Sequence, residues 1–219
     1  MDTILSGMTS LRLESFQAQS ARWPASGRHV LAQYDDDAVV VYQAYRPSIG
    51  RFTAEHGFFG GGFSLNRMSW IKPNFLWMMY RCGWATKEGQ EVVLAVWLAR
   101  AAFDEILSLA VPSSYWDHRY PDRETWQADV ARSDVRLQWD PDHDPHGNPV
   151  TRRAVQLGLR GRVLARYAKE WIRRVEDITP FVRDQHARLN SDGIAALETP
   201  LERVYPCLPS SQVGADPLP

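Results

Sequence analysis

Two apolar segments near the start of the chain are joined by three consecutive aspartates, and this pattern limits the folds that the chain can adopt. Residues 28–34 alternate in the manner of a strand, and residues 38–45 are rich in β-branched and aromatic side chains, which strands favour. Residues 35–37 are all aspartate, a residue type typical of turns. Two strands around so short a turn predict a hairpin.

The elements that follow favour an α+β fold. We expect helices at residues 46–56, 73–82, 101–110, 121–131, 161–175 and 179–189, and further strands at 91–98, 135–139 and 154–159. This order is irregular for a doubly wound sheet. We therefore predict a curved, mixed or antiparallel sheet of about five to seven strands, flanked by the helices at 73–82 and 161–175.

A chain of 219 residues is long enough to build one large core. It shows no internal repeat and no linker long enough to divide it. We expect residues 1–20 to form a flexible arm, residues 21–205 a single α+β domain, and the Pro- and Ser-rich residues 206–219 a disordered tail.

Charge and cysteine content argue against some classes of protein. The formal net charge is −1, which disfavours a nucleic-acid binder that uses its whole surface, although a local basic groove stays open. The two cysteines have neither zinc-ligand spacing nor a disulfide framework. We see no signal peptide and no apolar run of membrane-spanning length, so we expect a cytoplasmic protein without a membrane partner. The oligomeric state is left open.

Residues 140–149 contain side chains of metal-ligand type, His143, Asp144 and His146. They lie in a loop with proline and glycine rather than on a rigid helix face. Turn formation by Asp and Asn beside Pro and Gly explains this segment. We therefore predict no metal site.

Tryptophan is abundant, and five of the nine tryptophans lie between residues 70 and 116. One interpretation is a large aromatic core. The other is that some of these rings form a stacking surface for a planar ligand.

The block from Asn66 to Pro73 is the densest group of candidate binding residues. Arg67 and Lys72 supply positive charge, Trp70 supplies an aromatic face, and a helix beginning at Pro73 would offer free backbone N–H groups. Together these features suit a phosphate-bearing aromatic ligand such as a nucleotide. In the alternative interpretation, Trp70 packs in the core and the two cations pair with surface acids.

Other polar residues lie where the expected elements end. Tyr80, Arg81 and Lys87 follow the Asn66–Pro73 block at the far end of the same helix, Gln43 ends the second strand, and Gln156 lies in a late strand. Functional residues concentrate at such positions. We predict that a set of cations converges on one cleft, with two glutamines and a tryptophan nearby: Arg67, Lys72, Arg81 and Lys87, with Gln43, Gln156 and Trp70.

Several segments resemble the domain of unknown function family 4291. They include Val-Tyr-Gln-Ala-Tyr at 41–45, Asn-Arg-Met-Ser-Trp-Ile-Lys-Pro at 66–73 and Phe-Leu-Trp-Met-Met-Tyr-Arg at 75–81. Further matching segments are residues 34–37, 137–141, 153–159 and 176–180. They span residues 28–182, and the family brings no activity with it.

The order of elements also resembles, more distantly, the ADP-ribosyltransferase core. That resemblance implies an NAD cofactor bound in a cleft between two small sheets. Gln43 would then stand on the early strand, Trp70 or Tyr80 would stack on nicotinamide, and Gln156 would contact the nicotinamide ribose. The chain departs from the pattern, because those enzymes carry His or Arg on the early strand and a Glu on the late one.

Three functional hypotheses follow. The first is a nucleotide-binding, NAD-dependent ADP-ribosyltransferase-like enzyme, with Gln156 and Gln43 as catalytic residues. The second is a non-catalytic module that binds a nucleotide or an RNA end through the same cations. The third is a structural or interaction protein without a small ligand. Release of free nicotinamide and thermal shifts with nucleotides distinguish them.

Overall fold

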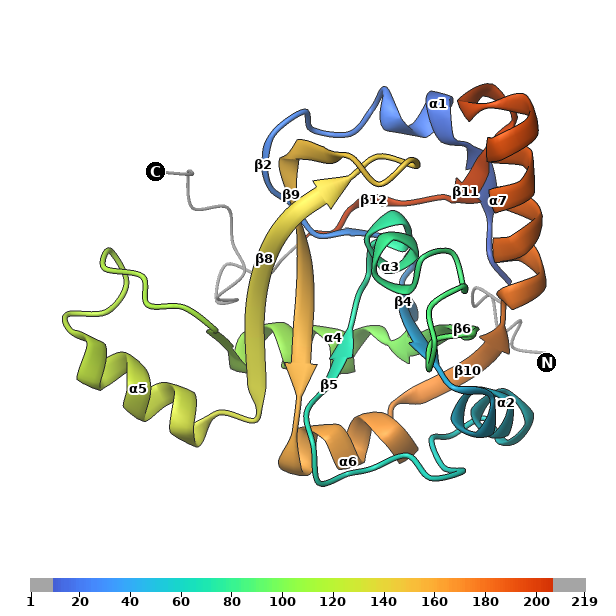
Figure 1. Cartoon of the computed structure of the whole chain (residues 1–219). Helices are drawn as coiled ribbons and strands as arrows, with labels where there is room; N and C mark the ends of the chain where they lie inside the picture. The colour runs from blue at the N-terminus through green and yellow to red at the C-terminus, as the bar shows by residue number, and fades with distance from the viewer. Residues whose placement is uncertain (1–9, 207–219) are drawn as a thin grey trace, which may run out of the picture.

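The structure is a computed structural model that describes residues 10–206, and these form a single α+β domain (Figure 1). The helices are α1 (Phe16–Ser20), α2 (Pro47–His56), α3 (Phe75–Cys82), α4 (Arg100–Leu109), α5 (Arg123–Arg132), α6 (Gly161–Lys169) and α7 (Thr179–Asp192). The strands are β1 (Leu13–Ser15), β2 (Gly27–Arg28), β3 (Leu31–Ala32), β4 (Ala38–Tyr45), β5 (Ser69–Ile71), β6 (Val92–Ala99), β7 (Ala110–Pro112), β8 (Val135–His143), β9 (Pro149–Leu159), β10 (Ile172–Asp177), β11 (Glu198–Pro200) and β12 (Arg203–Val204).

Two sheets meet at one backbone bridge. The first has the order β10-β6-β4 and is antiparallel throughout. The second has the order β2-β9-β8-β7, and β5 pairs with the end of β9. Tyr42 of β4 and Lys72, which directly follows β5, form the bridge, with N–H to O distances of 2.7 and 3.2 Å. The bridge joins the sheets into one curled, mixed sheet, which confirms the predicted fold class.

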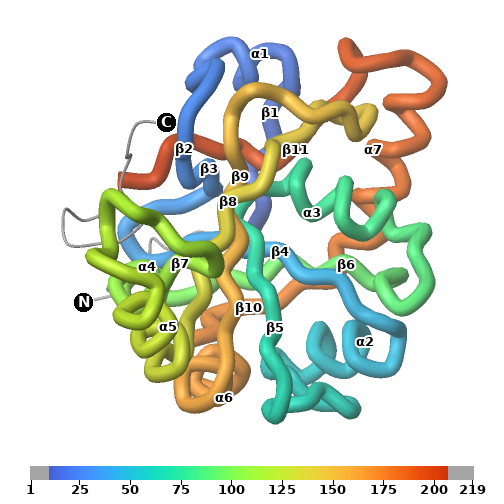
Figure 2. Tube along the Cα trace, turned by 60° about the vertical axis from the view of Figure 1, so that its left-hand side comes forward, coloured from blue at the N-terminus to red at the C-terminus, as the bar shows by residue number. Residues whose placement is uncertain are grey.

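The helices cover this sheet on both sides (Figures 1 and 2). The larger core lies inside the curl, where the inward faces of β4, β6, β8 and β9 meet residues of α2, α4 and α6. The smaller core lies on the opposite face of β4 and β6, beneath α3 and α7. Residues alternate between the faces of a strand, so β4 sends Val39 and Val41 into one core and Val40 and Tyr42 into the other.

Three expected elements differ in the structure. The strand expected at 28–34 is broken, because β2 pairs with β9 and β3 pairs with β12, and only the bridge between Tyr34 and Val39 forms the expected hairpin. The helix expected at 161–175 ends at Lys169. Residues 172–177 instead form β10, since pairing with β6 outweighs helical periodicity. The loop expected at 140–149 is shorter, because β8 and β9 extend along each other past a bulge after Pro141.

The expected arm at 1–20 is structured where it is described. Residues 13–20 form β1 and α1, and β1 pairs with β11. The buried Gln19 ties α1 to residues 199–202. Its amide nitrogen donates to Thr199 Oγ1 at 2.6 Å, and its amide oxygen accepts from Glu202 N at 3.0 Å. Residues 1–9, and 207–219 of the expected tail, lie outside the described residues.

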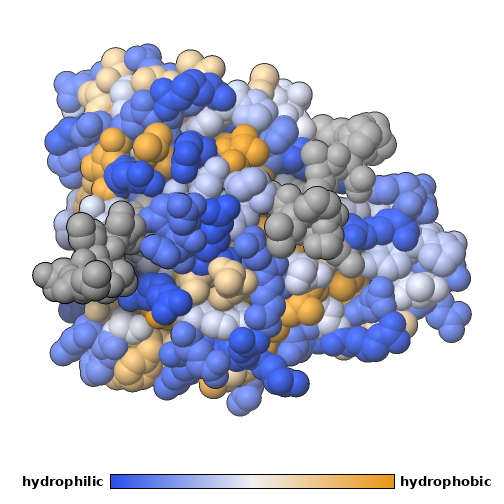
Figure 3. Space-filling model, turned by 180° about the vertical axis from the view of Figure 1, so that it is seen from behind, coloured by the Kyte–Doolittle hydropathy of each residue, from blue (hydrophilic) through white to orange (hydrophobic). Residues whose placement is uncertain are grey.

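The surface is mixed in polarity. Seen from behind, the molecule is mostly hydrophilic, and apolar residues gather only in separate small patches (Figure 3). Within residues 10–206, no helix combines the length and the apolar character that a membrane span requires.

Candidate functional site

One face of β8 and β9 is polar, and strand alternation explains why. Inward residues such as Leu137 and Leu157 are buried in the larger core, whereas Gln138 and Gln156, which pair across the two strands, point outward. Both amides converge on Asp140. Gln138 donates to Oδ1 at 2.8 Å and Gln156 donates to Oδ2 at 2.7 Å. The carboxylate is therefore held in a fixed orientation on this polar face.

The strands β4 and β5 separate beyond the Tyr42–Lys72 bridge, and Gln43 fills the gap. Its buried amide nitrogen lies 2.8 Å from Tyr45 Oη, 2.9 Å from Ser69 Oγ and 3.2 Å from the Trp70 carbonyl oxygen. Its amide oxygen accepts from Tyr167 Oη at 2.7 Å. Both ends of the Gln43 side chain are therefore bonded within the protein, and they hold the separated strands in place.

Lys72 is the one lysine that the structure buries, with 6% of its surface exposed. Among residues 10–206, the structure gives its ammonium group no hydrogen-bond or ion-pair partner. The pKa of Lys72 is lowered to about 8, mainly because burial disfavours the charged form and secondly because Arg81 is positively charged, while Asp140 and Cys82 oppose the shift. A buried cation with no partner is costly unless the site receives an anion or the amine loses its proton.

Lys72 lines a pocket of about 160 Å³ at the separated ends of β4 and β5, which we call the Lys72 pocket. Its other walls include Gln43, Tyr45, Arg67, Trp70 and Met78. An adjoining pocket of about 290 Å³ shares Tyr45 and Arg67 and adds Arg46 and Phe63. We call the two pockets together the groove.

Trp70 forms one wall of the Lys72 pocket by lying across the sheet. A Cβ atom on Gly158 would come within 3.0 Å of the Trp70 ring and 2.5 Å of Met68 Sδ. The absence of a side chain at Gly158 therefore lets the indole lie against β9. Trp70 is only partly buried, whereas Trp77, Trp84 and Trp97 are buried in the interior. The core interpretation thus fits most of the central tryptophans, and Trp70 keeps an accessible surface.

The start of α3 does not offer the free N–H groups that the sequence predicted. The helix begins at Phe75 rather than Pro73, and Asn74 caps it by accepting from Trp77 N at 2.7 Å. Glu202, from the far end of the chain, accepts from Phe75 N at 2.6 Å and from Asn74 Nδ2 at 3.2 Å. The protein's own carboxyl group therefore occupies this helix terminus.

The remaining predicted residues on and after α3 do not line the groove. Arg81 is exposed but close enough to Lys72 to affect its pKa. Lys87 instead caps the far end of α3, since its ammonium donates to the carbonyl oxygens of Tyr80 and Arg81 at 3.4 and 2.8 Å. Tyr80 stacks on His143 with ring centroids 3.6 Å apart and lines a separate cavity. The groove therefore brings together Gln43, Arg67, Trp70 and Lys72, whereas Gln156 is bonded to Asp140 and does not line it.

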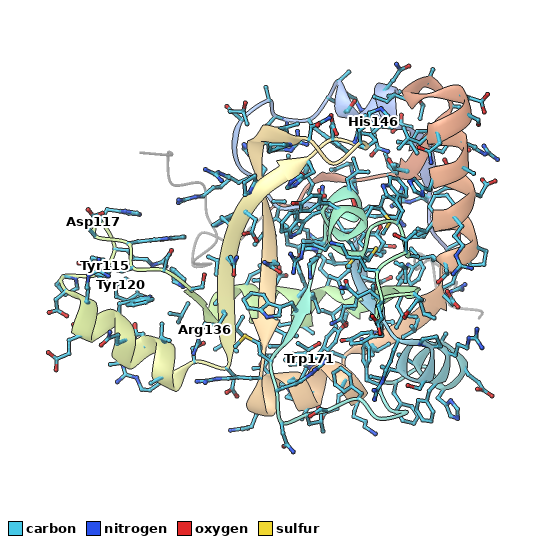
Figure 4. The ribbon with its side chains drawn as sticks, in the orientation of Figure 1. Tyr115, Asp117, Tyr120, Arg136, His146 and Trp171 are labelled. Atoms are coloured by element: carbon cyan, nitrogen blue, oxygen red, sulfur yellow. The ribbon has the colours of Figure 1, made fainter. Side chains whose placement is uncertain are left out.

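Other charged and aromatic clusters lie away from the groove (Figure 4). Tyr115, Asp117 and Tyr120 lie on the projecting arm that leads into α5, and Arg136 lies at the start of β8, near the end of α5. His146 lies at the tip of the β8–β9 hairpin, where Asp144 accepts from its backbone N–H in a turn, as predicted. Among residues 10–206, no group of three His, Cys, Asp or Glu side chains could hold a metal ion.

A more voluminous cavity, about 530 Å³, lies between α4, α5 and α6. Its charged side chains pair with one another, as Arg166 does with Glu105 and Arg132 with Asp129, each at 2.6 Å. Two of its cations, Arg132 and Arg166, are thus neutralised by acids of the same cavity, in contrast to Lys72.

Sequence reasoning missed two residues that shape this region. Glu202 and Tyr167 are distant in sequence from the residues they contact, and no local pattern marks them. A glutamate in a short apolar C-terminal stretch and a tyrosine on the apolar face of α6 were the available signals.

The comparison with protein families decides what kind of domain this is. The model of one family, Domain of unknown function (DUF4291), matches residues 29–205. The chain belongs to this family. No curated protein matches the sequence. The matched range of the DUF4291 domain runs from β3 to the segment after β12, so it includes both sheets except β2, the groove and Glu202.

Proposed function

We propose that the groove binds a phosphate-bearing ligand of the nucleotide class. The observation that carries this proposal is the ammonium group of the buried residue Lys72, which lines the pocket without a protein partner among the described residues. An anion bound there removes the cost of the unpaired charge. Arg67, exposed and shared by both pockets, supplies a second cation, and its planar group suits bidentate contact with phosphate.

The walls of the groove support a ligand that is more than a phosphate. The partly buried ring of Trp70 lines the Lys72 pocket, and Phe63 and Tyr45 line the adjoining one. The two volumes together fall at the lower end of the range of small-molecule sites, about 300–1,000 Å³. In this arrangement a base or nicotinamide ring packs against the aromatic side chains of the groove. The phosphate contacts Arg67 and Lys72.

A second candidate function is ADP-ribosyl transfer from NAD, and the orientation of Asp140 favours it. A carboxylate held by two amides can stabilise the positive charge that develops on ribose as nicotinamide leaves. In this mechanism Gln156 orients Asp140 rather than contacting the ribose itself. The proposal keeps the cytoplasmic location expected from the sequence. Its test is release of free nicotinamide from NAD, which Asp140→Asn should abolish.

The binding proposal is tested by thermal unfolding with NAD, ATP, GTP and a short 5′-phosphorylated RNA. A ligand at about one hundred times its Kd stabilises a fold by roughly 2.7 kcal/mol, so at least one of these should raise the Tm. Arg67→Ala and Lys72→Met should remove that shift. Arg183→Ala, which removes an exposed cation on α7, is the matched control and should keep it.

The outcomes separate the hypotheses. A shift with RNA and none with free nucleotides supports the module that binds an RNA end. A nucleotide shift that survives both groove substitutions places binding elsewhere. No shift with any of the four ligands contradicts the nucleotide proposal and leaves the structural or interaction protein.

A further inference from the structure

The chain uses lysine rarely, and this makes the buried one informative. Only three of its 25 basic Lys and Arg residues are lysine: Lys72, Lys87 and Lys169. Lys87 and Lys169 are exposed, whereas Lys72 is buried in its pocket. Arginine keeps its proton under all ordinary conditions and would bind an anion equally well, whereas lysine can become a neutral amine. The side chain at this position is therefore the type that permits nucleophilic chemistry.

The position of Lys72 is rigid. Its backbone exchanges both hydrogen bonds with Tyr42, which is itself buried in the smaller core. The preceding residue, Ile71, pairs with Leu157 of β9. Continuing this register sets Lys72 beside Gln156, so its side chain shares the polar face that carries Asp140. A reactive group anchored between two strands keeps its orientation without help from a ligand.

Two neighbours complete the chemistry of an amine nucleophile. Asp140, fixed by two glutamine amides, lies near enough to influence the pKa of Lys72, and its carboxylate can exchange a proton with the amine through an intervening water. Arg67 lines the same pocket as Lys72 and can hold an anionic group of the ligand while the amine reacts. The low pKa of Lys72, about 8, adds that a substantial fraction of the amine is neutral near physiological pH.

We propose that Lys72 is a nucleophile that forms an imine with the carbonyl carbon of a small phosphorylated aldehyde or ketone bound in the groove. This inference rests on the proposed function, because Arg67 and the groove supply the phosphate subsite. A nucleotide that ends in a free sugar, whose open-chain form is an aldehyde, is the member of this class that fits the nucleotide proposal.

The reaction balances without an oxidant or reductant. The Nζ lone pair of neutral Lys72 attacks the carbonyl carbon, forming a C–N bond, and the carbonyl oxygen takes a proton. Nζ then loses a proton to Asp140 through water, Asp140 passes a proton to the hydroxyl in the same way, and the nitrogen lone pair expels that group as water. The products are a protonated C=N bond to Lys72 and one water molecule, with one proton taken up from solvent, and Asp140 ends as a carboxylate.

The test uses pyridoxal 5′-phosphate as the probe, with borohydride to reduce any imine and peptide mass spectrometry to locate it. Pyridoxal, which lacks the phosphate, is the matched control. We expect Lys72 to be labelled at least about tenfold faster than Lys87 or Lys169, since an ordinary lysine near pH 7.5 is almost wholly protonated. We also expect pyridoxal 5′-phosphate to label Lys72 faster than pyridoxal does.

Three variants make the result specific. Lys72→Arg keeps the charge and should lose the fast label, whereas Lys87→Arg should keep it. Asp140→Asn should slow imine formation at Lys72 while leaving the slow labelling of the other two lysines unchanged. Far-ultraviolet circular dichroism and the Tm of each variant establish that it is folded.

The outcomes distinguish this inference from the proposed function. Pyridoxal and pyridoxal 5′-phosphate could label Lys72 at equal rates, both faster than they label the other two lysines. That result supports Lys72 as a nucleophile and contradicts phosphate recognition in the groove. Labelling of all three lysines at similar rates overturns the nucleophile, and the nucleotide thermal shifts then judge the binding proposal separately.

Discussion

Two buried ionisable residues, Glu202 and Lys72, lie near the start of α3. The first is hydrogen-bonded within the protein, and the second has no such partner among the described residues. Glu202 is 3% exposed, and both of its oxygens accept hydrogen bonds, one from the backbone of Phe75 and one from Asn74. Lys72, only two residues before Asn74, is 6% exposed and has no such partner among residues 10–206. Burial raises the pKa of Glu202 well above its ordinary range and lowers that of Lys72.

This difference in hydrogen bonding indicates a structural role for Glu202 and is what we expect of a binding-site residue for Lys72. A buried polar group that is fully bonded organises a fold, and here Glu202 ties the C-terminal segment to the first turn of α3. A buried group without a partner destabilises the fold and persists where it serves a site. The following substitutions test whether these two groups really differ in this way.

Removal of Glu202 should have the largest effect. Glu202→Ala leaves Phe75 N and the Asn74 amide without acceptors and opens a cavity, so we expect the free energy of unfolding to fall by about 2–4 kcal/mol. Urea denaturation measures it. The control is Glu198→Ala, which removes an exposed side chain 3.7 Å from Arg188 and should change stability by less than about 0.5 kcal/mol. A similarly small change in the unfolding free energy of Glu202→Ala would contradict a structural role for Glu202.

Replacement of Lys72 should have the opposite sign. Lys72→Met keeps most of the length of the side chain and removes the unpaired charge, so we expect the unfolding free energy at pH 7 to rise by about 1–3 kcal/mol. The same substitution at the exposed Lys87 removes its bonds to the end of α3 and should give no gain. A sharp loss of stability in Lys72→Met would show that Lys72 is a structural residue.

The advantage of Lys72→Met should shrink as the pH rises. The pKa of Lys72 in the folded protein, about 8, lies below that of an unfolded lysine, about 10.4. Between these values the unfolded chain binds more protons, so the natural protein gains stability with increasing pH and the variant lacks this gain. From pH 7 to 9.5 the gap should narrow by on the order of 1–2 kcal/mol. Urea denaturation of both proteins at each pH measures it, and a constant gap would contradict the shifted pKa.

The smallest effect is expected at the wall of the pocket. Gly158→Ala places a Cβ against Met68 and the Trp70 ring, so these side chains must shift. We expect a stability loss of about 1 kcal/mol and weaker ligand binding, because Trp70 is displaced. Tryptophan fluorescence and the nucleotide thermal shift measure the two effects. Unchanged ligand binding would show that Trp70 takes no part in the groove.

The sequence predicted the fold class and several elements well, because their signals are local. The proline and glycine that bracket α2, the β-branched run of β4 and the apolar run of β6 all lie within the segments they define. It failed where pairing partners are distant. Residues 172–177 become a strand only because β6 is beside them, and residues 69–71 become β5 because β9 is.

Four of the eight predicted site residues line the Lys72 pocket, whereas Tyr80, Arg81, Lys87 and Gln156 do not. Gln43, Arg67, Trp70 and Lys72 do line one pocket, but the reason given for an anion site was wrong. The expected helix terminus is occupied by Glu202, which lies 127 residues from Phe75. The burial of Lys72 depends on the bridge between two sheets, a long-range feature that residue spacing does not encode.

The most direct test of the central claim is a pH titration of Lys72 by NMR, in protein with isotope-labelled lysine side chains. The chain has only three lysines, so the spectrum has three side-chain signals, and Lys72→Arg identifies the one of interest. We predict that this signal titrates with a pKa of about 8 and that a bound nucleotide or pyridoxal 5′-phosphate perturbs it selectively. A Lys72 signal that titrates near the ordinary lysine value of about 10.4 and ignores both ligands would contradict the account.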